Sequence, residues 1–187
     1  MTVLATERLM LRQAAESDIA ALVDFFERNR EHLVRWEPSR PPDFYTEEFW
    51  RRQVALHRRV GENGTALMLF IFQKGASDRV IGQISITGII RGPAQMAFLG
   101  YALDALAEGK GYMQEALKVA IEHAFSVLNL HRLMANFQPA NIRSNNVLRR
   151  LGFTVEGYAR DYLFVDGAWR DHVLTSLTNP TWRDDGF

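Results

Sequence analysis

The sequence predicts a single mixed α/β domain, and three observations lead to this expectation. The chain has 187 residues, which is enough for one hydrophobic core and short for two domains. About seven stretches carry the alternating or continuous apolar pattern of β-strands, and four carry apolar residues at helical spacing. No internal repeat, low-complexity tract or linker separates these stretches. We therefore expect one domain over residues 1–187.

In the first half of the chain we expect a half-exposed strand, two helices and two further strands. Leu9 and Leu11 alternate with polar or flexible neighbours in the first strand, and Ser17 is a suitable N-cap for the first helix. Prolines at positions 38, 41 and 42 predict a loop, and a turn is expected at 75–78. The expected ranges are Leu4–Arg12 (strand), Asp18–Arg28 (helix), 29–42 (loop), Thr46–Arg59 (helix), Thr65–Gln73 (strand) and Val80–Ile90 (strand).

In the second half we expect four strands and two helices. Gly92-Pro93 predicts a hairpin between two strands, and Asp166-Gly167 predicts a tight turn between the last two. Apolar residues from Met113 to Leu128 form one helical face, and Gly152 takes the usual glycine position after a helix. The expected ranges are Met96–Leu103 (strand), Tyr112–Leu128 (helix), His131–Gln138 (strand), Ile142–Leu151 (helix), Phe153–Val165 (strand) and Ala168–Leu177 (strand).

Composition and charge exclude several classes of protein. Hydrophobic residues make up 47% of the chain and charged residues 24%, and the formal net charge is zero. We therefore expect neither a broad basic surface that binds nucleic acid nor sequence-specific binding of nucleic acid. The absence of cysteine removes disulfides, thiolate nucleophiles and thiolate metal sites. No signal-peptide pattern is present, and apolar runs such as 66–72 are too short for a membrane span, so we expect a cytoplasmic protein that binds no membrane.

Two glycines, Gly109 and Gly111, stand between an expected strand and the clearest expected helix. Glycines let the backbone approach a ligand, and the free amides of a helix N-terminus favour an anion. A Walker-type loop is excluded, because Asp104 stands where its first glycine should be and no Ser or Thr follows Lys110. A dinucleotide fingerprint is excluded because Gln114 replaces its third glycine. The remaining interpretation is a site for the pyrophosphate of coenzyme A, with a plain turn as the alternative.

This loop resembles the acetyl-CoA loop of the GNAT acetyltransferases, usually written Gln/Arg-x-x-Gly-x-Gly/Ala. Glu108 departs from that pattern at its first position, and Met113 replaces the small residue expected after the glycines. The resemblance continues, at matching spacing, through the segments 139–153, 156–162 and 166–172, and upstream through Asn29-Arg30, Leu33, Trp36-Glu37-Pro38 and Arg40. Over nearly the whole chain the sequence is similar to the Rim subgroup, in particular to RimJ-like ribosomal-protein-alanine N-acetyltransferases.

The resemblance implies the GNAT fold, which is a central mixed, mostly antiparallel sheet of about seven strands flanked by helices. It also implies transfer of the acetyl group of acetyl-CoA to an amine by direct attack in a ternary complex. The acceptor it implies is the N-terminal alanine of a small-subunit ribosomal protein. Two alternatives stay open: the same chemistry on a small amine, and a non-catalytic module that binds acyl-CoA or assists ribosome assembly. The sequence leaves open whether the protein is a monomer or a homodimer.

The resemblance assigns cofactor contacts to two segments and two single residues. The end of the strand before the loop would pair with pantetheine, and one of its amides would hold the thioester oxygen. The amides that follow would hold the pyrophosphate, and a later asparagine and serine would contact the cofactor arm. These residues are Tyr101, Ala102, Leu103, Gly109, Lys110, Gly111, Tyr112, Met113, Gln114, Asn141 and Ser144. Asn141 is equally suited to cap the helix that follows it.

The catalytic groups are less clearly indicated. Ser144 matches a position close to the sulfur, where it could protonate the leaving thiolate, although an ordinary first-turn serine is the alternative. Some relatives use a glutamate base and a tyrosine acid at positions that here hold Asn136 and Leu148, so the chain does not follow that scheme.

Three acidic residues remain as candidate bases: Glu37, Asp161 and Asp171. A surface or hairpin ion pair, with Arg160 or Arg170 as the expected partner, is the alternative role for each. Trp36, Glu37 and Asp171 are expected to contact the acceptor. The histidines lack metal-ligand spacing, so no metal is expected.

Overall fold

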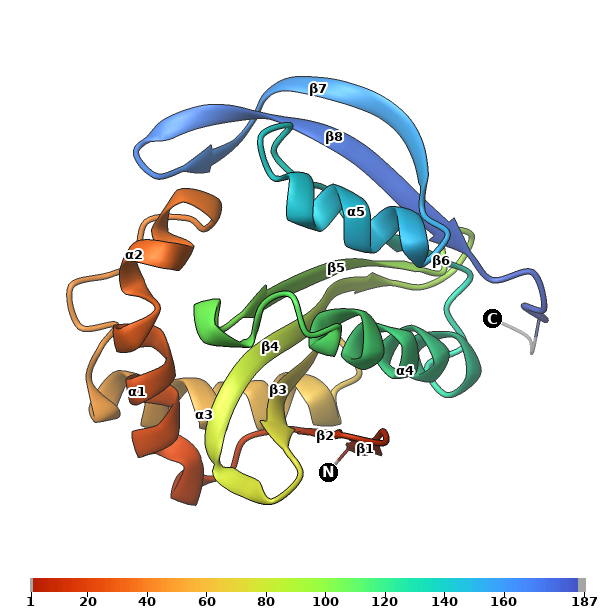
Figure 1. The fold of residues 1–187 in the computed structure, drawn as a ribbon. Helices are drawn as coiled ribbons and strands as arrows, with labels where there is room; N and C mark the ends of the chain where they lie inside the picture. The colour runs from red at the N-terminus through yellow and green to blue at the C-terminus, as the bar shows by residue number, and fades with distance from the viewer. Residues whose placement is uncertain (1, 185–187) are drawn as a thin grey trace.

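The computed structural model describes residues 2–184 and contains one eight-stranded sheet (Figure 1). The strand order is β1-β2-β3-β4-β5-β6-β8-β7, and all neighbours are antiparallel except β5 and β6. The expected mixed, mostly antiparallel sheet is confirmed, with one more strand than predicted. The strands are β1 (Val3–Ala5), β2 (Leu9–Arg12), β3 (Leu67–Gln73), β4 (Ala76–Ile90), β5 (Met96–Leu103), β6 (Arg132–Met134), β7 (Thr154–Val165) and β8 (Ala168–Thr178).

Five α-helices in the described part of the chain cover the two faces of the sheet (Figure 1). They are α1 (Ile19–Arg28), α2 (Arg30–Leu33), α3 (Glu47–Glu62), α4 (Tyr112–Ser126) and α5 (Ile142–Arg150). Side chains alternate across a strand, so β3 contributes to the hydrophobic cores on both faces of the sheet. Leu69 and Ile71 join the core under α4, whereas Phe70 and Phe72 join the core under α1 and α3.

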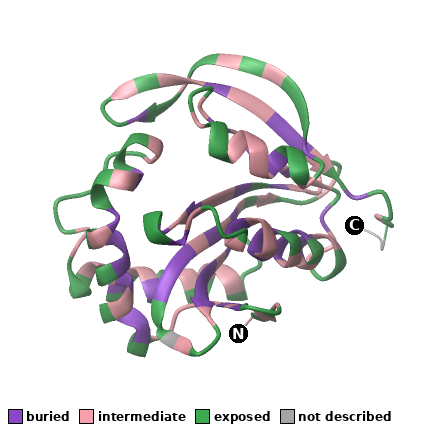
Figure 2. Cartoon of the chain, in the orientation of Figure 1, coloured by how far each residue is buried: buried purple, intermediate pink, exposed green. Residues whose placement is uncertain are grey.

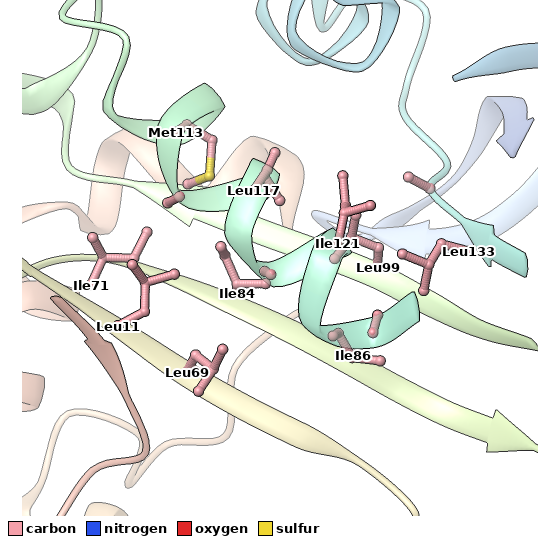
Figure 3. Close-up of a cluster of buried hydrophobic side chains, with 14 of the residues drawn as sticks. Leu11, Leu69, Ile71, Ile84, Ile86, Leu99, Met113, Leu117, Ile121 and Leu133 are labelled. Carbon is pink, nitrogen blue, oxygen red and sulfur yellow. The ribbon is translucent and has the colours of Figure 1, made fainter. Parts of the chain in front are cut away.

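The larger core lies between the sheet and α4 (Figure 3). The predicted apolar face of α4, including Leu117 and Ile121, packs on β-branched and leucine side chains such as Ile84 and Ile86 of β4. Ile84 and Leu117 are fully buried, and burying such a side chain stabilises the fold by about 1.5–3 kcal/mol relative to leaving it exposed. This packing fixes the start of α4 against the end of β5.

The second core is largely aromatic. Phe26 of α1 stacks on Trp50 of α3 with ring centroids 4.6 Å apart, and Phe44 meets both rings edge-on. The cluster fixes α3 and the loop before it against the sheet. Strand β7, by contrast, contributes no residue to either core, and most of its residues are exposed or half-buried (Figure 2).

Strands β5 and β6 pair in parallel only through Met96, Ala97 and Phe98. The second half of β5 continues to pair with β4, as Tyr101 does with Ile84. The two parallel strands therefore diverge, and the β6 side of the second half of β5 faces a gap in the sheet. Main-chain groups on such an edge are available to a ligand.

Several predicted boundaries are wrong. The predicted strand Leu4–Arg12 is two strands, because a turn closed by the Thr6 amide and the Leu9 carbonyl at 2.9 Å folds β1 back on β2. Ser17 lies inside a 3₁₀ turn, Glu16–Asp18, instead of capping α1. The predicted loop 29–42 begins with α2 and a 3₁₀ turn at Val34–Trp36. β4 already begins at Ala76, inside the turn predicted at 75–78, and β6 is only three residues long.

Other local predictions are confirmed. Gly152 follows α5 with φ 86°, and the tight turn at Asp166-Gly167 has φ values of 49° and 71°, the left-handed pair of a hairpin turn. β4 and β5 form the predicted hairpin. Among the described residues, no helix is long and apolar enough to cross a membrane.

Candidate active site

Two cavities meet beside the second half of β5. The α4 cavity, about 530 Å³, lies between β5, the start of α4 and α5. The α3 cavity, about 540 Å³, lies between α3, the sheet and the loop at 36–41. Five residues line both cavities: Trp36, Glu37, Tyr101, Asn141 and Ser144. A molecule in one cavity can therefore reach a molecule in the other at this junction.

The α4 cavity collects the residues that the sequence assigned to the cofactor, with a single exception. Lys110 does not line it; its carbonyl oxygen accepts a hydrogen bond from Arg8 at 3.0 Å. The residues that line it are Tyr101, Ala102, Leu103, Gly109, Gly111, Tyr112, Met113, Gln114, Asn141 and Ser144. The divergence of β5 from β6 leaves the first three of these at the open edge of the sheet.

The glycine loop adopts a conformation that glycine alone takes readily. Gly109 has φ 74° and Gly111 has φ 77°, both in the left-handed region. Gly111 is also the N-cap of α4. The first amides of a helix have no partner within it, and the helix dipole gives them positive character. The cavity therefore presents N–H donors suited to a phosphate anion.

Hydrogen bonds and an ion pair from the N-terminal β1–β2 hairpin hold this loop in place. Glu115 of α4 accepts hydrogen bonds from the Thr6 hydroxyl and from the Arg8 amide at 3.0 Å, and the Arg8 guanidinium pairs with it at 2.5 Å. Burial raises the pKa of Glu115, but the hydrogen bonds from Thr6 and Arg8 outweigh it and hold the pKa below its ordinary value. The carboxylate therefore stays charged and tied to β1–β2.

Glu108, the departure from the family loop, is balanced by nearby nitrogen groups. Its carboxylate lies 3.2 Å from the Arg143 guanidinium and 3.4 Å from His32 Nε2. Arg150 of α5 lines the same cavity. The acid therefore does not leave an unpaired negative charge beside an anionic ligand.

Asn141 and Ser144 stand at the start of α5. The Asn141 side chain caps this helix, because its Oδ1 accepts from the Ser144 amide at 3.1 Å. The Ser144 hydroxyl lies 2.7 Å from the Tyr101 hydroxyl. Burial raises the pKa of Tyr101 to about 12, so its phenol stays protonated at neutral pH. The two hydroxyls form a relay that can carry a proton at the junction of the cavities.

Trp36 and Glu37 enter both cavities from the loop after α2. Arg40 holds this loop, because it forms an ion pair with Glu37 and stacks over the Phe44 ring at 4.4 Å. The alternative role of Glu37 as an ion-pair partner is therefore observed, and its carboxylate still reaches the junction.

Asp161 and Asp171 lie on the β7–β8 hairpin, and their side chains line neither cavity. Asp171 accepts from the Tyr158 hydroxyl at 2.5 Å and from the Asp161 amide at 2.9 Å. The hydrogen bond from Tyr158 is the main reason that the pKa of Asp171 lies below its ordinary value. Asp161 sits at an irregularity of β7 with φ 47°. The two aspartates therefore lie next to each other, but away from the junction where Glu37 and Ser144 lie.

His172 was overlooked as a candidate catalytic residue in the sequence. It follows Asp171 on β8 and therefore points to the opposite face of the strand, where it lines the α3 cavity. Its side chain is 5% exposed, and its Nδ1 lies 2.9 Å from the Arg170 carbonyl oxygen. Strand alternation was the available signal, since an exposed Asp171 implies a neighbour that faces inward.

The α3 cavity also contains groups from β4 and α3. Ser85 and Gln83 of β4 form part of its floor, and Trp50 and His57 of α3 form its far wall. Trp50 Nε1 and His57 Nδ1 are buried and have no hydrogen-bond partner within residues 2–184. In the same part of the chain, no group of three or more His, Cys, Asp or Glu side chains could hold a metal ion.

Comparison with known proteins gives a consistent result. Residues 8–154 match the family model described as an acetyltransferase (GNAT) domain. The chain is 38% identical to the [ribosomal protein uS5]-alanine N-acetyltransferase of Escherichia coli, over 96% of this chain and 92% of that protein.

Two solved structures are also similar. The ribosomal-protein-S5-alanine acetyltransferase of Vibrio fischeri is 37% identical with a TM-score of 0.93, over 98% of this chain and 100% of that chain. RimJ of Mycobacterium smegmatis, solved in complex with CoA-disulfide, is 31% identical with a TM-score of 0.85, over 91% of this chain and 81% of that chain.

Proposed function

The chain belongs to the GNAT acetyltransferase family, and we propose that it transfers the acetyl group of acetyl-CoA to the N-terminal alanine of a small-subunit ribosomal protein. The observation that carries this proposal is the junction of two cavities at Tyr101, Asn141 and Ser144. The α4 cavity holds the acetyl donor and the α3 cavity holds the acceptor. Direct attack within a ternary complex follows, because both substrates reach the junction together.

The residues around the α4 cavity fit coenzyme A. The amides from Gly109 to Gln114 would hold the pyrophosphate at the start of α4, with Arg143 and Arg150 adding positive charge. The open edge of β5, Tyr101 to Leu103, would pair with the pantetheine arm. Acetyl-CoA then supplies a thioester whose carbonyl carbon accepts the amine. No metal takes part in this proposal.

Two groups of this chain would stabilise the reaction at the junction. A main-chain amide of β5 near Ala102 would bind the oxygen on which negative charge develops, an interaction typically worth about 3 kcal/mol of barrier. The Ser144 hydroxyl would protonate the leaving sulfur and recover its proton through Tyr101, whose hydroxyl lies 2.7 Å away. Of the acidic candidates from the sequence, Glu37 reaches both cavities and Asp161 reaches neither.

A peptide acceptor fits the α3 cavity better than a small amine. The cavity floor crosses three strands in one row, because Gly100, Ser85 and Met68 are register partners. At about 4.8 Å between strands, this row alone spans about 10 Å, which is the length of about three extended residues.

Glu37 and Trp36 would receive the N-terminal ammonium at the junction. The Glu37 carboxylate is paired with Arg40, but its second oxygen can still accept a hydrogen bond from the ammonium, and Trp36 supplies an aromatic wall. Asp171, which the sequence also assigned to the acceptor, lies on the exposed hairpin and could meet only a more distant part of a protein substrate. We propose that the reaction takes place in the cytoplasm, where ribosomal proteins are made.

Acetyl-CoA turnover, followed by release of free thiol, tests the proposal. The acceptors are six-residue peptides that begin with the alanine-starting N-terminus of a small-subunit ribosomal protein. The matched controls are the same peptide with a blocked N-terminus and a panel of small amines, including polyamines. Turnover that requires the free N-terminus supports the proposal.

Two other results would contradict it. Turnover with small amines alone would show that the protein is an acetyltransferase whose acceptor is not a peptide. Tight acetyl-CoA binding without turnover on any acceptor would instead indicate a non-catalytic module.

A further inference from the structure

We propose that His172 is the general base of the reaction, taking a proton from the acceptor ammonium at Nε2. The inference rests on the proposed function only in requiring an amine acceptor in the α3 cavity. It concerns a residue that none of the sequence motifs identified as catalytic.

The hydrogen bonding of His172 determines which ring nitrogen is available. Its Nδ1 lies 2.9 Å from the main-chain carbonyl oxygen of Arg170. A carbonyl oxygen only accepts hydrogen bonds, so Nδ1 must carry the proton in the neutral ring. Nε2 then holds the lone pair and can accept a proton. Because the side chain is 5% exposed and lines the α3 cavity, this acceptor position is largely sheltered from bulk water.

The groups packed around His172 hold the ring in place. The Tyr162 ring from β7 lies 5.6 Å from the imidazole, and the Tyr162 hydroxyl accepts from Asn136 Nδ2 at 3.3 Å. Asp171, the next residue on β8, is close enough to interact electrostatically with His172.

The charges beside Asp171 and across the α3 cavity have partners, and Arg170 Nε, two residues before His172, donates to the Val165 carbonyl oxygen at 3.3 Å. Arg160 of β7 interacts electrostatically with the Asp171 carboxylate, and Tyr158 donates a hydrogen bond to the same carboxylate. Across the α3 cavity, Glu37 and Arg40 form an ion pair, so together they add little net charge. His172 therefore experiences one neighbouring carboxylate and no unpaired cation among the residues that line the cavity.

The other ionisable side chains of the α3 cavity are poorer candidates. Among the described residues these are Glu37, Arg40, His57 and Tyr101. Arg40 cannot act as a base, and its ion pair with Glu37 commits that carboxylate. Burial raises the pKa of Tyr101 to about 12 and lowers that of His57 to about 4, so the phenol is an acid and the His57 ring a weak base at neutral pH. This leaves His172.

The proton balance can be written in full. The acceptor enters as an ammonium, and His172 Nε2 takes one proton to leave a neutral amine. The amine nitrogen attacks the thioester carbonyl carbon, forming a C–N bond and moving an electron pair onto the carbonyl oxygen. That pair returns as the C–S bond breaks, and the nitrogen passes its remaining extra proton to the sulfur through the Tyr101 and Ser144 hydroxyls. The products are an amide and a thiol, and the imidazolium releases its proton to solvent.

The test compares variants of His172 across pH 5.5 to 9.5. His172→Asn is the main variant, because its side-chain amide can still donate to the Arg170 carbonyl but offers no base at the Nε2 position. His172→Gln is the second variant, in case the first fails to fold. His123→Gln is the matched control, because His123 is a half-buried histidine that lines neither cavity. Folding is checked by thermal unfolding, and the cofactor site by acetyl-CoA affinity.

The expected result is a loss in kcat/KM for the acceptor of about 100-fold at pH 6.5, in the range of a general base. The loss should shrink to less than tenfold at pH 9.5, because an α-amine with a pKa near 7.7–8 is already neutral there. Acetyl-CoA affinity and the His123→Gln profile should match the unmutated protein.

A loss that is equal at all pH values, or no loss in a folded variant, would overturn the inference. A nitrogen-15 NMR spectrum of the unmutated protein provides a second check, since a neutral His172 protonated at Nε2 would also overturn it. If the protein acetylates only small amines, the peptide proposal fails, and the same experiment runs with that amine.

Discussion

Asp104 is a buried carboxylate whose loss should destabilise the fold by a measurable amount. Its side chain is 2% exposed and accepts hydrogen bonds from Arg28 Nε and from the Leu106 amide, both at 2.9 Å, and Arg79 lies 3.5 Å away. These contacts tie the end of β5 to α1. Asp104→Asn keeps the shape of the side chain and removes its charge.

The expected size of this effect follows from the contacts that remain. A hydrogen bond to a charged group contributes about 1.5–3 kcal/mol, and removing one partner of a buried ion pair costs about 3–5 kcal/mol. In the Asp104→Asn variant, Arg28 still pairs with the Asp24 carboxylate and donates to the Val80 carbonyl oxygen. We therefore expect the loss of folding stability to lie at the lower end of that range, at about 3 kcal/mol. In a domain of this length, that loss lowers Tm by about 6–12 °C.

Thermal unfolding at pH 7, followed by circular dichroism, measures the change. Asp24→Asn is the matched control, because it removes the other carboxylate of the same arginine from a side chain that is 63% exposed. The control should cost less than about 1 kcal/mol, as exposed ion pairs do. Equal shifts in Tm for the two variants, or a shift below about 2 °C for Asp104→Asn, would refute the reasoning.

The effect of Asp104 should also depend on pH. Burial raises its pKa, but the hydrogen bonds from Leu106 and Arg28 outweigh this and hold the pKa below its ordinary value of 3.8. A lowered pKa means that the folded state binds fewer protons, so the stabilisation is present above about pH 4 and is lost as pH falls further. The difference in Tm between Asp104→Asn and the unmutated protein should therefore narrow below pH 4.

Three further predictions concern the junction of the cavities. Gly111→Ala should raise the KM for acetyl-CoA about 5- to 30-fold, because a side chain in the left-handed region costs about 1–2 kcal/mol; an unchanged KM in steady-state kinetics would contradict the role of this loop. Ser144→Ala should lower kcat about 100-fold with little change in either KM, and a change in KM alone would indicate binding and not proton transfer. Glu37→Gln should raise the KM for the acceptor about tenfold. Asp161→Asn should change kcat/KM less than threefold, because its side chain lines neither cavity. A larger loss for Asp161→Asn than for Glu37→Gln, measured side by side, would make Asp161 a candidate base again.

Local sequence patterns predicted the elements that carry the proposed cofactor site. The apolar face of α4 appears at three- and four-residue spacing, and the glycines before it mark a left-handed turn at a helix start. Both signals act within one helix and its cap, so a single chain segment contains them. The same holds for Gly152 after α5 and for the Asp166-Gly167 turn.

The predictions that were wrong depend on contacts between distant segments. β1 folds back onto β2, and Glu115 on α4 binds both Thr6 and Arg8 near that turn. α2 is a single helical turn followed by a loop in which Arg40 stacks over the Phe26 ring of α1 at 5.0 Å and the Arg35 carbonyl accepts from Gln138 Nε2 at 3.0 Å. Neither arrangement has a periodic signal, because partners far along the chain stabilise each.

The sequence by itself determined the order of most helices and strands and the residues around the glycine loop, because these follow from spacing within short segments. Only the tertiary structure decided which acidic and basic groups meet the junction of the cavities. Asp171 and His172 are neighbours in sequence, yet strand alternation turns the first toward Tyr158 and the second into the α3 cavity. The direction of a side chain depends on the pairing and twist of its strand, which distant residues set.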